Sequence, residues 1–285
     1  MKLISVWGSP NSGKTTLSIE IAKVLSSRIN KNCLIIFTDD LTSPLNYLFP
    51  SLSEQGDSLG RIITSAGFYQ DELIKGMVYH PDYKHLCFLG FRKNETRYNY
   101  SEISEMQVLD LFVSLSQLVD YVIVDCTSDF TNNPISQHAL REGSCIQVGG
   151  GDLKSISYFN DTHYLSQAYP GMRERNTIVA NNPNDFDIWK SVAEQYGQTQ
   201  YYFPFVMDLQ DHYLEEKSLS LLKPNKHNRD FLREMEQLVR NIIDGDIDTT
   251  VKPLKEKKKA KPKKSFFRKK QNKKEETHGD DGSIK

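Results

Sequence analysis

A short segment near the start of the chain places the tightest limit on its fold. Residues 8–15, GSPNSGKT, have a glycine, four further residues and then Gly-Lys-Thr, which is the spacing of a phosphate-binding loop. An apolar run, KLISVW, precedes this segment, and an amphipathic helical pattern follows it at 15–29. Lys14 would reach the β and γ phosphates, and the Thr15 hydroxyl would hold Mg²⁺. The segment therefore predicts binding of a nucleoside triphosphate at the positive end of a helix.

Strand-like and helix-like segments alternate after this loop. The strand-like runs lie at 2–7, 32–38, 85–91, 120–125, 144–150, 176–182 and, more weakly, 200–205. The helical patterns include 15–29, 103–119, 153–168 and 186–196, and 212–243 reads as two closing helices broken near Pro224. This alternation predicts an α/β fold of the P-loop NTPase type, with a mainly parallel sheet covered by helices on both faces.

A second nucleotide motif follows about a hundred residues later. In VDYVIVDC, four apolar residues from Tyr121 to Val124 lead to Asp125. A buried strand that ends in a carboxylate is the arrangement of a Walker B segment, whose aspartate supports Mg²⁺ through a water molecule or through Thr15. Many buried strands end in aspartate, so the motif gains its weight from the phosphate loop before it.

The order of these parts over about residues 1–240 resembles the ParA/MinD group of P-loop ATPases. In that group the second strand ends in an acidic pair within the first switch, and here LIIFTDDLTSPL supplies Asp39 and Asp40. Asp40 is the closer match to the hydrolytic aspartate, while the family's first acidic position falls on Thr38. The segment NTIVANN places Asn181 where the family reads adenine, and YFPFVMDLQ resembles its loop around the base, at Pro204.

The resemblance and the motifs together give a set of expected site residues. Lys14, Asp40 and Asp125 are the expected catalytic residues, and Thr15, Asp40 and Asp125 are expected to hold Mg²⁺. The expected ATP-binding residues are Gly8, Ser9, Asn11, Ser12, Gly13, Lys14, Thr15, Thr16, Asn181 and Pro204.

One departure from the family pattern concerns its second loop lysine. In many members that lysine reaches across a dimer to the partner's nucleotide, but here the position is Ser9, and Pro10 replaces the usual glycine. We therefore expect slow hydrolysis. Within the group, the pilus-assembly and secretion-localising branch (TadZ/CpaE-like) looks most similar in this respect, although we expect no counterpart of that branch's receiver-like N-terminal domain.

The C-terminal part of the chain differs from the rest in composition. Apolar content falls beyond Gly245, which predicts an ATPase domain at 1–245 and a disordered Lys-rich tail at 246–285. Residues 252–274 carry thirteen Lys or Arg and one acid, although the whole chain has a formal net charge of -1. Such a tail can be merely solubilising or can bind DNA. We favour an anionic membrane surface, because Phe266 and Phe267 add an apolar element to the cationic cluster.

Other candidate chemistry is weaker. The four cysteines and seven histidines show no metal-ligand spacing. Nucleophilic catalysis has little support, because Ser9, Ser12 and Ser128 lack an evident His/Asp partner. The segment 92–100, RKNETRYNY, mixes basic and aromatic residues, and a solvated loop is favoured there over a nucleic-acid or partner contact. The absence of a signal peptide and of a long apolar run predicts a cytoplasmic protein, peripheral at most to the inner face of the membrane.

Two classes of function follow. The first is a switch ATPase that homodimerises with ATP and positions or partitions a partner of a pilus, secretion, conjugation or partition system, or DNA; a scaffold with negligible turnover is a variant of it. The second is a P-loop small-molecule kinase, which would need an acceptor pocket and usually an arginine-rich lid. The region between the second strand and the Walker B segment has only three arginines, Arg61, Arg92 and Arg97, and they are not clustered. The switch is therefore favoured.

Overall fold

The structure is a computed structural model of the whole chain. It describes residues 1–28, 30–52, 57–65, 70–162, 164, 169, 171–172, 174–181, 191–215 and 217–242. The predicted tail 246–285, with its basic segment 252–274, lies outside the described residues.

The described strands form one eight-stranded sheet in the order β3-β4-β2-β5-β1-β6-β7-β8. Their bounds are β1 Lys2–Gly8, β2 Cys33–Phe37, β3 Val78–Tyr79, β4 Leu86–Leu89, β5 Tyr121–Asp125, β6 Ser144–Gly149, β7 Asn176–Asn181 and β8 Tyr201–Phe203. All neighbouring strands are parallel except the edge pair β3 and β4. The apolar runs at the centre of the sheet are buried on both sides, which is typical of parallel sheets.

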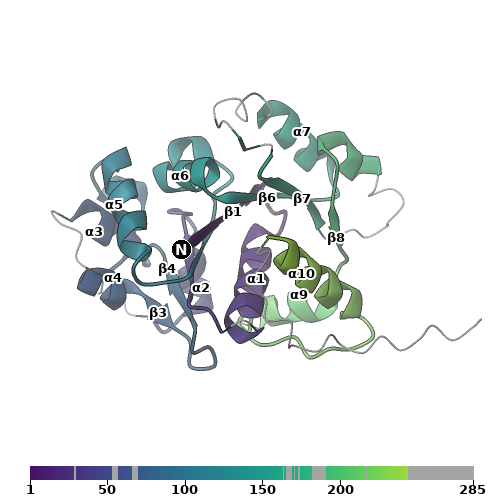
Figure 1. Cartoon of the computed structure of the whole chain (residues 1–285), viewed down its shortest axis with the longest axis horizontal. Helices are drawn as coiled ribbons and strands as arrows, with labels where there is room; N and C mark the ends of the chain where they lie inside the picture. Colours follow the sequence, from purple (N-terminus) through teal and green to yellow (C-terminus); the bar gives the residue numbers. More distant parts are fainter. Residues whose placement is uncertain are drawn as a thin grey trace, which may run out of the picture. The chain divides into compact units, whose positions relative to one another are not determined.

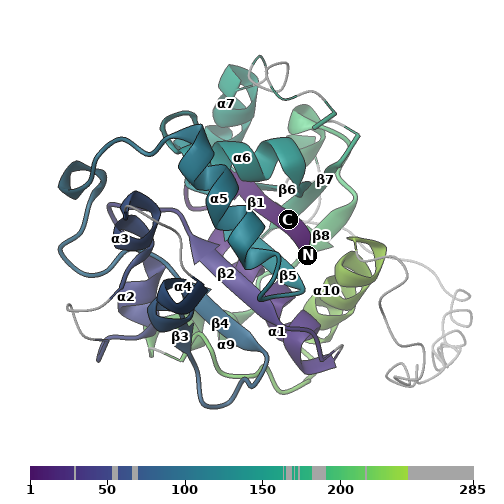
Figure 2. The same ribbon diagram turned by 60° about the vertical axis from the view of Figure 1, so that its left-hand side comes forward.

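Helices cover both faces of this sheet (Figures 1 and 2). Their bounds are α1 Lys14–Arg28, α2 Pro44–Leu48, α3 Leu59–Thr64, α4 Gln70–Gly76, α5 Glu105–Leu115, α6 Pro134–Glu142, α7 Leu153–Thr162, α9 Met207–Leu214 and α10 Arg229–Ile242. Short 3₁₀ turns occupy Arg97–Asn99 (η1), Phe130–Asn132 (η2) and Glu194–Tyr196 (η4).

Alternating strand residues divide the core into two layers. In β2, Cys33, Ile35 and Phe37 belong to the cluster that also contains residues of α1, α2 and α10. Leu34 and Ile36 belong to the cluster formed with α3, α4, α5, α6 and α7. Because successive side chains of a strand point to opposite faces, the continuous apolar runs supply both layers at once.

The predicted fold class is confirmed, and the main strands lie where the sequence places them. Several elements differ from the prediction. The helices α2, α3, α4 and α6 and the strand β3 are additional. The first closing helix is α9 at Met207–Leu214, earlier than predicted, and the second is α10. The predicted helix at 186–196 lies partly outside the described residues, and its described end contains the 3₁₀ turn η4.

The sheet topology prepares a site at one edge. The parallel strands β1, β2 and β5 are neighbours, so their carboxyl ends meet, and ligands of open α/β sheets bind at such edges. The segments that leave these ends are the phosphate loop, the acidic pair Asp39–Asp40 and the segment after Asp125. Within the described residues, no helix is long and apolar enough to cross a membrane.

Candidate nucleotide site

The phosphate loop curls between the end of β1 and the start of α1. Gly8 and Gly13 have φ angles of 150° and 86°, which glycine adopts readily. A Cβ on Gly8 would lie 2.0 Å from the Val148 carbonyl oxygen, and one on Gly13 would lie 2.2 Å from the Asn181 side-chain amide. Backbone packing against β6 and side-chain packing against β7 therefore require glycine at these two positions.

Lys14 and Thr15, the first residues of α1, face the end of β5. The Lys14 Nζ donates to the Ser9 carbonyl at 2.9 Å and contacts the Ser128 hydroxyl at 2.7 Å. The Thr15 hydroxyl donates to the Asp125 carboxylate at 2.6 Å. Burial lowers the pKa of Lys14, and the nearby charge of Asp125 opposes this shift. These contacts bring the cation, the hydroxyl and the carboxylate expected around a Mg²⁺-bound triphosphate to one place.

Asp125 is buried, and burial raises its pKa to about 6. Hydrogen bonds from Thr15 and Ser18 and the charge of Lys14 oppose the shift. A buried carboxylate that is ionised costs free energy unless a cation lies beside it. Thr15 and Asp125 therefore fit a Mg²⁺ ion, which prefers oxygen ligands. No group of three or more His, Cys, Asp or Glu suited to a metal occurs among the described residues.

A cavity of about 1070 Å³ lies in front of these residues. It is lined by Asp125 and by most of the expected ATP-binding residues, namely Asn11, Ser12, Gly13, Lys14, Thr15, Thr16, Asn181 and Pro204. Gly8 and Ser9 form the root of the loop and do not line the cavity. The Asn181 amide donates to the Ser12 carbonyl at 2.8 Å and so fastens the loop to β7.

Sequence reasoning placed the loop 202–210 around the base but did not identify Tyr47 in the apolar wall of the cavity. Tyr47 of α2 and Tyr213 of α9 stack edge to face, with ring centroids 5.7 Å apart, and Phe205 and Leu209 line the same region. Burial raises the pKa of Tyr47. This wall fits a planar base, since aromatic and apolar side chains favour burial of a flat ring. Tyr47 gives no sequence signal, because it lies in a short helix with no amphipathic pattern.

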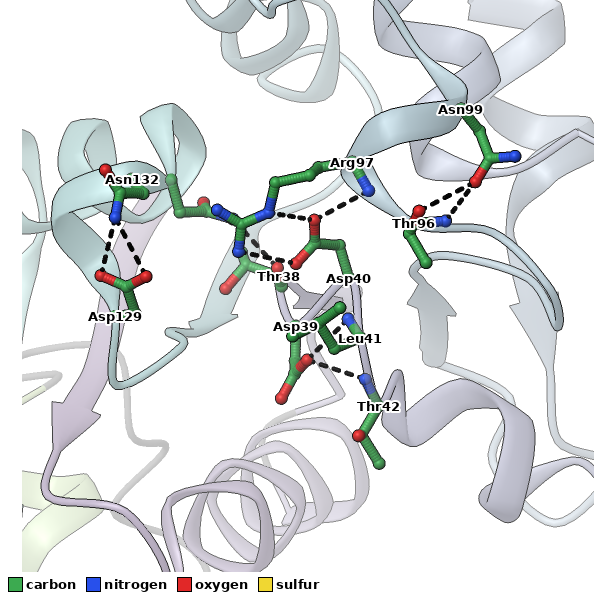
Figure 3. A network of polar contacts seen from close by, with 11 residues as sticks. Thr38, Asp39, Asp40, Leu41, Thr42, Thr96, Arg97, Asn99, Asp129 and Asn132 are labelled. Atoms are coloured by element: carbon green, nitrogen blue, oxygen red, sulfur yellow. Dashed lines mark hydrogen bonds and ion pairs between the residues drawn. The ribbon is translucent and has the colours of Figure 1, made fainter.

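The acidic pair is oriented differently from the prediction. Asp40 is the expected catalytic and metal-binding residue, but Asp39 lines the cavity and Asp40 does not. Asp40 instead accepts hydrogen bonds from Arg97 (Figure 3). The two carboxylates point in opposite directions after the end of β2, Asp40 toward Arg97 and Asp39 toward the backbone N–H groups of Leu41 and Thr42. The acid at the cavity wall is therefore Asp39, one residue before the predicted Asp40.

Ser9 is fully buried and faces the interior. Its hydroxyl lies 2.7 Å from the hydroxyl of Ser155, which accepts a hydrogen bond from the Gly150 backbone N–H at 2.9 Å. The position at which the ParA/MinD group carries its second lysine therefore connects the phosphate loop to the start of α7.

Several solved structures share this fold. The septum site-determining protein MinD of Pyrococcus horikoshii, solved with Mg-ADP, has a TM-score of 0.62 and 14% identity, over 86% of this chain and 97% of its own. A ParA family ATPase of Chlorobium tepidum has a TM-score of 0.63 and 16% identity, over 83% and 98% of the two chains. A McdA variant of Cyanothece, solved with ATP, has a TM-score of 0.65 and 15% identity, over 88% and 99%.

The chain has the ParA/MinD-like P-loop ATPase fold. No protein-family model matches the sequence, and no characterised protein matches it by sequence. The ParA/MinD-like fold accounts for the meeting of the phosphate loop, the acidic pair and Asp125 at one sheet edge.

Proposed function

We propose that the chain is an ATP-binding switch protein that hydrolyses ATP slowly and acts through a nucleotide-dependent homodimer. The observation that carries this proposal is the cluster of Lys14, Thr15 and Asp125 beside the cavity. Its cation, hydroxyl and carboxylate suit a nucleoside triphosphate with Mg²⁺. The structures of similar fold were solved with Mg-ADP or ATP, which supports the same ligand here.

Each group has a proposed task in this function. The amides of the phosphate loop and Lys14 bind the phosphates, while Asn181 and Pro204 lie beside the base. Thr15 and Asp125 would hold Mg²⁺, which neutralises charge on the phosphates during transfer. An acid of the loop after β2 orients the attacking water, and we assign this task to Asp39, because it lines the cavity.

Slow turnover is proposed from Ser9. Its buried hydroxyl pairs with Ser155, so this position supplies no cation to a neighbouring nucleotide. Cations placed at a phosphoryl transition state contribute large rate factors. A chain without one at this position is expected to bind ATP well and turn it over slowly, or to act as a nucleotide-binding scaffold.

The cellular role proposed is positioning or partitioning of a partner of a pilus, secretion, conjugation or partition system, or of DNA. Support comes from the fold shared with a septum site-determining protein and a plasmid partition protein of Borrelia burgdorferi, the latter with a TM-score of 0.62. We further propose a cytoplasmic protein that associates peripherally with the membrane through 252–274.

A small-molecule kinase is less well supported. Among the described residues that line the cavity, Lys14 is the only basic one. The three arginines considered for a lid are engaged elsewhere: Arg61 with Glu95, Arg92 with the Asp57 carbonyl and Arg97 with Asp40. A kinase usually collects such cations around its transferred phosphoryl group.

Radiolabelled ATP tests the proposal directly. The expected result is Mg²⁺-dependent binding by calorimetry, release of labelled inorganic phosphate and a doubling of mass in solution with a non-hydrolysable ATP analogue. Transfer of label to an acceptor other than water would favour the kinase. Absence of ATP binding would remove the proposed function altogether.

A further inference from the structure

The loop 92–100 reaches the acidic pair from outside the cavity. Asp40 Oδ2 accepts the Arg97 backbone N–H at 2.9 Å and its Nε at 3.0 Å, and Oδ1 accepts from Nη2 at 3.3 Å. Figure 3 shows the guanidinium lying over the Asp40 carboxylate, while Asp39 points away toward Leu41 and Thr42. The loop 92–100 is therefore not simply solvated.

The ion pair is asymmetric in exposure. The Asp40 side chain is 8% exposed, whereas that of Arg97 is 39% exposed. A forked guanidinium satisfies a carboxylate with two directed hydrogen bonds, which fixes orientation as well as charge. Loss of Arg97 would leave a buried carboxylate with one backbone donor, an arrangement that costs free energy.

Asp39 is fixed by its neighbours. Its Oδ1 accepts the backbone N–H groups of Leu41 and Thr42, each at 2.9 Å. The charge of Asp39 acts on Lys14 and on Asp125, since it raises the pKa of both. Asp39 and Asp40 are consecutive residues, so the ion pair that holds Asp40 also restrains the backbone of Asp39.

Thr38 and Asp129 connect the same loop to the end of β5. The Thr38 hydroxyl donates to the Asp125 carbonyl at 2.9 Å and accepts from the Thr127 N–H at 3.0 Å. Asp129 lies close enough to raise the pKa of Arg97, although Asp40 contributes more. Arg97 is thus placed where the segments after β2 and β5 meet.

We propose that Arg97 is a positioning residue for ATP turnover, because its ion pair with Asp40 holds the loop after β2 with Asp39 facing the phosphates. This inference rests on the proposed function. Arg97 does not touch the cavity, so its contribution is to the rate of hydrolysis and not to the affinity for ATP.

The test is single-turnover hydrolysis of radiolabelled ATP, with ATP affinity measured separately by calorimetry. Arg97→Gln and Asp40→Asn are each expected to lower kcat roughly ten- to a hundredfold, the scale of a small misplacement of a reacting group. ATP affinity should stay within about twofold, since Arg97 lies outside the contacts that bind phosphates. Arg97→Lys should restore part of the rate, because lysine keeps the charge but not the fork.

The matched control is Arg61→Gln. Arg61 also pairs with a largely buried carboxylate, Glu95, at 3.4 Å, but neither residue belongs to the acidic pair. This variant should keep the wild-type kcat. The double variant Arg97→Gln/Asp40→Asn should be no slower than the slower single variant, because both changes break one interaction.

The outcomes separate the two proposals. A wild type that neither binds nor hydrolyses ATP overturns the proposed function and this inference with it. A wild type that hydrolyses ATP while Arg97→Gln keeps full kcat overturns this inference alone, as does full additivity in the double variant. Thermal unfolding of each variant shows whether it is folded. If Arg97→Gln is unfolded, the rate of hydrolysis by Arg97→Lys is compared with that of the wild type instead.

Discussion

At the residue scale, the site depends on one cation that the phosphate loop presents to the cavity. Lys14 is partly desolvated, which lowers its pKa, and Asp125 compensates for this burial. We expect Lys14→Ala to weaken ATP binding by roughly 1.5–3 kcal/mol or more, the range of a charged hydrogen bond. Calorimetry with Mg·ATP measures this loss. Lys154→Ala, an exposed lysine of α7, is the control, and equal affinity in wild type and Lys14→Ala would refute the assignment.

A second prediction at this scale concerns the buried hydroxyl pair. Ser155→Ala removes the partner of Ser9 and leaves the Gly150 N–H without its acceptor. It should therefore cost about 1–3 kcal/mol of unfolding free energy, against about 0.5–1.5 kcal/mol for Ser9→Ala. Denaturant unfolding of both single variants and the double variant measures the coupling. Strict additivity would show that the two hydroxyls do not interact in solution.

The acidic pair marks the limit of what sequence could predict for the site. The phosphate loop and Asp125 carry sequence patterns, and the family resemblance indicates Asn181 and Pro204; these residues line one cavity. Choosing between Asp39 and Asp40 requires knowing which of the two side chains faces the cavity, and two consecutive aspartates do not reveal this. The pairing of Arg97 with Asp40 could not be predicted from the sequence, since only the fold brings the two residues together.

At the element scale, predictability follows from burial. The central strands could be predicted from the sequence, because strands that are buried on both faces of a sheet read as continuous apolar runs. The short helices α2, α3 and α4 have at most seven residues, too few for a clear helical period. Tertiary packing places such elements, so propensity alone does not identify them.

The contact between α5 and α6 gives a pH-dependent prediction. His138 of α6 stacks on Phe112 of α5, with ring centroids 4.5 Å apart. Burial lowers the pKa of His138, with Arg141 acting in the same direction and Glu142 and Glu105 opposing it. The unfolded chain therefore binds this proton more readily. Stability is complete above the ordinary value of 6.5 and falls as pH drops through the folded-state pKa.

Unfolding in denaturant between pH 7.5 and 5.5 measures this dependence. His138→Gln should make the loss of stability on acidification smaller than in the wild type, because glutamine does not titrate. The comparison variant is His227→Gln, which changes an exposed histidine before α10. An equal change in both variants would contradict the assignment to His138.

At the scale of the whole molecule, charge is divided unevenly along the chain. Residues 252–274 hold thirteen of the 36 basic residues. A basic cluster attracts both DNA and anionic lipid, because its cations neutralise the phosphates of the one and the headgroups of the other. The two surfaces differ in what an apolar side chain contributes. Neutralisation of a DNA backbone needs only charge, whereas a membrane interface also accepts aromatic rings.

We therefore expect salt-sensitive binding of the full chain to vesicles that contain anionic lipid, lost in a version ending at Gly245. Each Lys or Arg near such a surface contributes about 1 kcal/mol, and salt screens this attraction. Phe266→Ala/Phe267→Ala should weaken cosedimentation with vesicles more than it weakens binding to duplex DNA, because only the vesicle offers the rings an apolar boundary. The membrane role would be refuted if the double variant lost binding to vesicles and to DNA equally, since the tail would then act through its charge alone. It would also be refuted if the full chain did not bind vesicles at physiological salt.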